Sequence, residues 1–150
     1  MPLILIITLK KNILFILANL LVIIGFSQNS RPFIYNYSPK EYNAYIQNWN
    51  AVQDNKGVMY FANNYGVLTY NGNSWGLIAT TNQSIVRTLA IDDEETVWVG
   101  GVNQFGYLKT SSTGELSFVS LTDSLLSKIG DFGNVWSIIF HQKSILFSTD

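Results

Sequence analysis

The chain has 150 residues, no cysteine, and ten acidic residues against nine basic ones. Without a basic stripe to neutralise a row of phosphates, we expect no nucleic-acid binding through this region. The lack of cysteine removes disulfides, thiolate nucleophiles and cysteine-ligated metals, and we expect no metal or other cofactor. Apolar residues make up 47% of the chain but gather near its beginning, so the composition averages two different segments.

The first 27 residues have the pattern of a secretory signal peptide. Two lysines precede an apolar run at 13–26, and small residues lead to a cleavage point between Ser27 and Gln28. We therefore expect export of everything that follows this hydrophobic helix. An uncleaved membrane anchor is the alternative, because residues 3–26 could span a bilayer. The two lysines inside that span would each cost about 2.5–3.5 kcal/mol at its centre, which favours the signal peptide.

The remainder of the chain repeats itself. Residues 52–63 align with residues 90–101 at an offset of 38, which places Asp54 on Asp92 and Tyr60 on Trp98. A third copy begins at Val135. Each match is short, but the matches occur in the same order in every copy, which is the signature of a repeat architecture.

Each copy consists of short runs rich in Val, Ile, Trp, Tyr and Phe that are separated by turn residues, a pattern typical of strands. The Asn71-Gly72 pair between two such runs is a strong hairpin signal. Residues 28–48 are expected to form a lead-in segment before the first strand. One helical turn is expected at 122–128, in the link between the second and third copies. The predicted strands, in chain order, are 49–53, 58–62, 67–70, 75–80, 86–91, 96–100, 105–109, 116–121, 135–140 and 145–148.

Four short strands per roughly 40 residues, with an aromatic residue in the second strand, are typical of a β-propeller blade. The predicted fold is all-β: an incomplete propeller of about two and a half four-stranded antiparallel blades. Blade 1 is expected at 49–80, blade 2 at 86–121, and the start of a truncated third blade at 135–150. A sandwich or an up-and-down barrel also uses such hairpins, but has no reason to repeat its turns and aromatics in order.

Several stretches resemble the two-component regulator propeller proteins of Bacteroidetes, namely 42–49, 52–63, 66–75, 99–108 and Asp131-Phe-Gly-Asn-Val-Trp136. The resemblance covers about residues 32–150. It implies an exported sensor region at the periplasmic face of the inner membrane. In that family a triple-tyrosine domain, a membrane helix and an intracellular output module, either a histidine kinase or a LuxR-type helix-turn-helix, follow the propeller.

Because none of those later parts is in the sequence, we expect an N-terminal fragment of such a regulator. The remaining blades of the parent chain would then be its partners, and a homodimer of the parent is an open alternative.

The chemistry-bearing residues do not form a catalytic pattern. The only histidine, His141, and the acidic run at 92–95 are both predicted to be solvated turn residues, since neither has the spacing of a metal or calcium site. The carboxylates are scattered without the pair that a glycoside hydrolase requires. We therefore predict no enzymatic activity. Tyr60 and Trp98 are expected in the core, whereas Trp49 and Trp75 could serve either the core or a sugar-stacking surface.

In a propeller, the loops between second and third strands share one face with the links between blades. Amide and aromatic side chains there suit neutral polar ligands such as oligosaccharides. The predicted function is therefore that of an exported ligand-sensing propeller region in a membrane-bound two-component-type transcriptional regulator. A secreted propeller enzyme acting on polysaccharide and a purely structural protein-interaction propeller are the alternatives. The predicted ligand-binding residues are Asn63, Asn64, Tyr65, Asn103, Gln104 and Phe105.

Overall fold

The computed structural model describes residues 9–17, 19 and 32–150. The chain divides into two units, Met1–Asn36 and Tyr37–Asp150. In the first unit, residues 9–17 form a helix with exposed side chains. The predicted cleavage point at Ser27 and Gln28 lies outside the described residues. Within the described ranges, no helix combines the length and apolar character that a membrane span requires.

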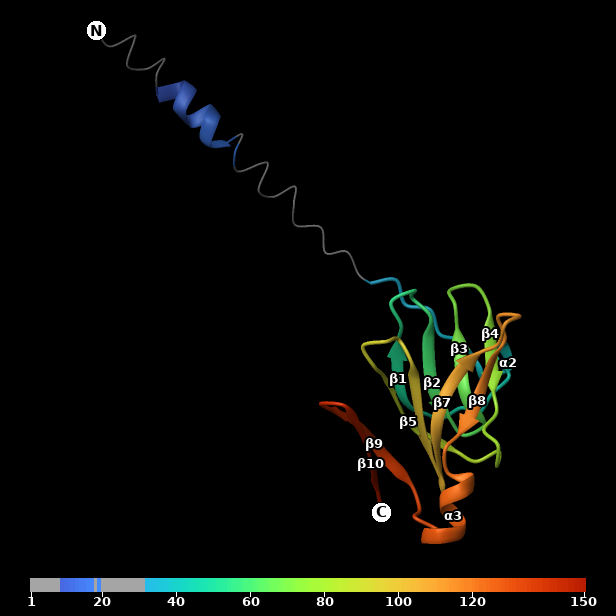
Figure 1. Ribbon diagram of the computed structural model, residues 1–150. Coiled ribbons are helices and arrows are strands. Elements are labelled where there is room, and N and C mark those ends of the chain that lie inside the picture. The colour runs from blue at the N-terminus through green and yellow to red at the C-terminus, as the bar shows by residue number, and fades with distance from the viewer. Residues whose placement is uncertain (1–8, 18, 20–31) are drawn as a thin grey trace. The chain divides into compact units, whose positions relative to one another are not determined.

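The second unit is built from antiparallel sheets, which confirms the all-β prediction (Figure 1). Within each sheet, every strand pairs with the next one along the chain, and the strands begin and end within about two residues of their predicted positions. The first sheet contains β1 (Asn48–Gln53), β2 (Met59–Asn63), β3 (Gly66–Tyr70) and β4 (Trp75–Ile78). The second contains β5 (Val86–Ile91), β6 (Val97–Gly101), β7 (Gln104–Thr110) and β8 (Leu116–Ser120), and the third β9 (Val135–His141) and β10 (Ser144–Thr149).

Two short helices accompany the sheets. Helix α2 (Pro39–Tyr42) lies in the predicted lead-in segment, and α3 (Asp123–Ile129) confirms the helical turn expected between the second and third copies. The three sheets do not form a closed ring within the described residues, so the propeller itself stays a prediction.

The turn between the first two strands has the same hydrogen-bond pattern in both four-stranded sheets. One aspartate oxygen accepts the backbone N–H groups of the residues two and four positions later. The other oxygen accepts a hydrogen bond from the aromatic residue six positions later. These partners are Asp54 and Tyr60 at 3.1 Å in the first sheet, and Asp92 and Trp98 at 2.8 Å in the second. The matched residues of the sequence repeat are therefore equivalent in space.

The environment of these turns shifts two pKa values. Burial raises the pKa of Tyr60 to about 12, and the hydrogen-bonded Asp54 carboxylate adds to the effect. Partial burial acts to raise the pKa of Asp92, but hydrogen bonds from Trp98, Thr96 and Glu94 outweigh it and hold that pKa below its usual value.

The sheets pack face to face through their first strands, with β1 against β5 and β5 against β9. Ala62 and Val86 belong to the buried cluster between the first two sheets. At the next junction, Gly100 takes the place of Ala62 and Val135 that of Val86. A Cβ atom on Gly100 would lie 2.6 Å from a Val135 methyl carbon, so this contact requires glycine. Phe147 completes the second junction by stacking on Phe105, with 4.3 Å between ring centroids.

The outer face of the first sheet is covered by the lead-in segment. Tyr42 and Ala44 are buried there together with Leu68, and Phe61 packs against this cluster. Trp75 also packs here, with its ring centroid 4.4 Å from that of Tyr70. Trp75 therefore serves the packing of this cap.

We predict that Asp92→Ala lowers the free energy of unfolding by about 1–2 kcal/mol, because two backbone N–H groups and the Trp98 indole lose their acceptor. Urea unfolding measures the change. Asp93→Ala, on the exposed part of the same turn, is the matched control and should change stability by less than about 0.5 kcal/mol. Equal losses for the two variants would show that the hydrogen bonds of Asp92 contribute nothing.

The stability lost in Asp92→Ala should depend on pH. Since folding lowers the pKa of Asp92, its stabilising effect is fully present above the unfolded-state pKa and disappears as the pH falls through the folded-state value. The stability difference between the wild-type chain and Asp92→Ala should therefore shrink on acidification below about pH 4. A difference that stays constant from pH 7 to pH 3 would contradict this.

We predict that Gly100→Ala destabilises the chain by about 1–3 kcal/mol, because the new methyl group overlaps Val135 and the Thr88 methyl carbon at 2.8 Å. Thermal and urea unfolding give the magnitude. Adding Val135→Ala makes room, so the double variant should lose less stability than the sum of the two single variants. Strict additivity would mean that the two residues are not in contact.

Candidate functional site

Loops from all three sheets meet at one end of the second unit, which we call the link end. It comprises the β2–β3 and β6–β7 turns and the links at 79–85 and 121–134. Val102 in the β6–β7 turn donates its N–H to the carbonyl of Ile85, and Asn103 donates its N–H to the carbonyl of Gly133 at 2.7 Å. Figure 1 shows α3 at the same end. The predicted sharing of one end by turns and links is thus confirmed.

The first strand of each of the three sheets carries a bulge near its start, at the link end. The strand ladders skip Trp49 in β1, Arg87 in β5 and Trp136 in β9. Each of them is the second residue of its strand. Bulges turn a side chain out of the normal alternation and are frequent beside binding sites.

Arg87 contacts both tryptophans, and the three bulged residues form what we call the Trp–Arg–Trp stack. The Cζ atom of Arg87 lies 3.9 Å from the ring centroid of Trp49 and 5.2 Å from that of Trp136. Both distances permit cation–π attraction. The stack thereby joins the three sheets at the link end through side chains rather than backbone.

Each member of the stack also has a polar anchor. The Trp49 indole N–H donates to Asn64 Oδ1 at 2.7 Å. Arg87 Nε donates to Asn134 Oδ1 at 3.0 Å, and the Trp136 indole donates to a carboxylate oxygen of Asp150 at 2.7 Å. Hydrogen bonds from Asn134 and Trp136 hold the pKa of Asp150 below its usual value.

The stack is accessible to solvent and incompletely satisfied. Trp49 is 40% exposed and Trp136 is 49% exposed. Arg87 Nη1 is buried without a hydrogen-bond partner, and so are Asn50 Oδ1 and Gln104 Oε1. All three of these atoms belong to residues in or next to the link end. The groups that a ligand at this end can reach are therefore the partly exposed indole rings rather than these buried atoms.

Two of the predicted ligand-binding residues hold the loops together. Asn63 is completely buried, and its amide bonds to the N–H and carbonyl of Tyr45 and to the N–H of Tyr65. Asn103 has a positive φ of 51°, and its side-chain oxygen accepts the N–H groups of Phe132 and Gly133. The Asn63 amide is therefore engaged inside the fold, and the side-chain oxygen of Asn103 is engaged by the link at 121–134.

The other predicted residues divide between interior and surface. Gln104 is only 3% exposed, and Phe105 is half-buried between Phe132 and Phe147. Asn64 is half-buried beside Trp49, whereas Tyr65 is 54% exposed. Tyr65 also meets Tyr45 edge-on, with 5.6 Å between ring centroids. Aromatic side chains therefore form part of the exposed surface of the link end.

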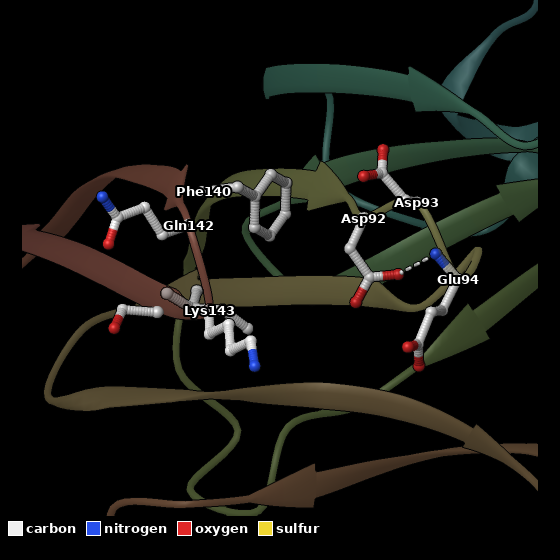
Figure 2. Close-up of a pocket in the computed structure, with 8 residues that line it drawn as sticks. Asp92, Asp93, Glu94, Phe140, Gln142 and Lys143 are labelled. Carbon is white, nitrogen blue, oxygen red and sulfur yellow. Dashed lines mark hydrogen bonds between the residues drawn. The ribbon is translucent and has the colours of Figure 1, made fainter.

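A separate cleft of about 290 Å³ lies at the opposite end of the sheets. Figure 2 shows Asp92, Asp93 and Glu94 on one side of it, facing Phe140 and Lys143 on the β9–β10 hairpin. The Asp92 carboxylate is already used by the turn and by Trp98. In the part of the chain that the structure describes, no group of carboxylates and histidines has the arrangement of a metal site. The link end is the better candidate.

Comparison of the chain with protein-family models, with curated proteins and with solved structures finds no match. The candidate site therefore rests on its own geometry.

Sequence reasoning missed Arg87 and Trp136 as site residues. Both follow a buried valine that begins the first strand of a copy, as Val86-Arg87 and Val135-Trp136. That shared position was the available signal, since Trp49 is also the second residue of its strand.

We predict that two neighbouring asparagines differ in how much their replacement lowers stability. Asn63→Ala should lower the free energy of unfolding by about 2 kcal/mol or more, because it empties a fully buried position and leaves part-buried backbone groups of Tyr45 and Tyr65 without partners. Asn64→Ala removes one exposed hydrogen bond to Trp49 and should cost less than about 1 kcal/mol. Urea unfolding distinguishes them, and a larger loss for Asn64→Ala would reverse the assigned roles.

Proposed function

We propose that the chain is the ligand-sensing region of an exported regulator, and that its sheets are successive propeller blades. The link end binds an oligosaccharide or another polar ligand, and the region has no catalytic activity of its own. The parent protein is a membrane-bound regulator of the two-component type, as the resemblance of residues 32–150 suggests.

The observation that carries this proposal is the convergence of the three bulged residues. The first strands of propeller blades surround the central axis, so side chains that bulge from their starts gather at the mouth of the channel. Trp49, Arg87 and Trp136 meet in this way. Half-exposed indole rings suit the apolar face of a sugar ring.

The amide side chains at the link end favour a ligand that carries hydroxyl groups. Asn64 is half-buried beside Trp49, and Gln83 is exposed in the link at 79–85. An amide group can both donate and accept a hydrogen bond, and so can a hydroxyl group. Saccharides carry several hydroxyl groups on each ring.

Binding can be tested on the full chain with a panel of neutral oligosaccharides, by isothermal titration calorimetry and tryptophan fluorescence. The double variant Trp49→Ala/Trp136→Ala should weaken binding at least about tenfold, which corresponds to about 1.4 kcal/mol. The matched control is Gln142→Ala/Lys143→Ala, which changes the cleft at the opposite end.

Binding that survives the tryptophan variant but is lost in the control would move the site to the cleft of Figure 2. No response to any oligosaccharide or other polar ligand would contradict the sensing function. Release of reducing ends during the titration would favour the enzyme alternative.

A further inference from the structure

The turn between β3 and β4 contains the Asn71-Gly72 pair, which can react with itself. Residues 71–74 form this turn, the pair Tyr70 and Trp75 closes it, and all four turn residues are exposed. Gly72 has a φ of 90°, a conformation that glycine adopts without strain. A Cβ atom on Gly72 would meet nothing within 4 Å, so the backbone of the turn is open to solvent.

The side-chain carbonyl group of Asn71 is held by three hydrogen-bond donors. Its Oδ1 atom accepts the N–H groups of Asn73 at 3.0 Å and Ser74 at 2.8 Å, and the hydroxyl group of Ser74 at 3.2 Å. Donors placed around a carbonyl oxygen stabilise the negative charge that develops there when a nucleophile attacks the carbon, as in an oxyanion hole. The turn therefore activates Cγ of Asn71 towards attack.

The backbone nitrogen of Gly72 is the nucleophile, because its attack on Cγ of Asn71 closes a five-membered ring. Among the described residues, the Gly72 N–H donates to no acceptor. The Gly72 carbonyl accepts the hydroxyl group of Tyr70 at 2.9 Å, which holds the glycine in the turn without engaging its nitrogen. The attacking atom is thus exposed and unengaged beside an activated carbonyl group.

We propose that Asn71 is a site of spontaneous deamidation in the folded chain. The Gly72 nitrogen forms a bond to Cγ of Asn71 and gives its proton to solvent. The bond from Cγ to Nδ2 breaks, and Nδ2 takes up a proton and leaves as ammonia. Water then opens the resulting succinimide ring and leaves aspartate or isoaspartate at this position. One water molecule is consumed for each ammonia released, and nothing is oxidised or reduced.

The turn is suited to the aspartate product. A carboxylate oxygen in place of Oδ1 can accept the same three hydrogen bonds. Asp54 and Asp92 already accept backbone N–H groups in this way in their own turns. The reaction adds one negative charge to a chain whose net charge is -1, and the modified chain should retain its fold.

Peptide mapping of the full chain after incubation at neutral pH measures the reaction. Trypsin releases residues 57–87 as one peptide, which also contains Asn73 and Asn82 as internal controls, and fragmentation spectra assign each deamidation. We expect Asn71 to react at least about tenfold faster than either control, because neither of them is followed by glycine.

Replacement of Ser74 tests the contribution of the structure. Ser74→Ala removes the hydroxyl donor and should slow the reaction at Asn71 at least about twofold. Ser74→Thr is the matched control, since it keeps the hydroxyl group and should react like the wild-type chain. Circular dichroism checks that both variants fold. The proposal is overturned by an Asn71 that stays intact in the folded chain, by equal rates at Asn71, Asn73 and Asn82, or by a Ser74→Ala rate equal to that of the wild-type chain.

Discussion

The close approach of one sheet to the next is the constraint on which the rest of this structure depends. A twisted four-stranded sheet with apolar residues on both faces cannot bury them alone, so it needs a neighbour on each side. Here the neighbours meet where a small residue of the second strand faces a valine at the start of the next sheet. Gly100 leaves no room for a side chain because Val135 fills the space. The spacing between the second and third sheets is therefore set by the absence of a side chain at Gly100.

This packing also creates the candidate site. The first strands of the three sheets lie side by side. The residues that bulge from the starts of these strands therefore lie close together. A guanidinium between two indoles is a favourable outcome, because the ring faces attract its charge while the Arg87 Nε still reaches Asn134. The site is thus a consequence of sheet packing rather than of any single loop. It joins three segments that are far apart along the chain.

Sequence reasoning reached the strands, the repeated aspartate turns and the shared end of turns and links, because each has a local signal. Alternating apolar residues mark strands, and an aspartate followed by turn residues and an aromatic marks the first turn of a copy. The orientation of Arg87 and Trp136 has no such signal, since a bulge is a defect of pairing that depends on the partner strand. The burial of Asn63 has no local signal for a related reason. A polar residue at a turn is expected on the surface, but Asn63 bonds to Tyr45, 18 positions earlier, and is buried by that contact.

The two ends of the sheets differ in the kind of surface that their connections present. At the end that bears the aspartate turns, the connections are tight and the Asp54 and Asp92 carboxylates are consumed by their own turns and by the following aromatic residue. The carboxylates in these tight turns already have hydrogen-bond partners, so few of their acceptors are left for a ligand. At the link end, longer connections bring side chains from three sheets together and leave the rings of Trp49 and Trp136 partly exposed. Recognition requires accessible groups held in fixed positions, and the sheet packing holds these two rings in place at this end.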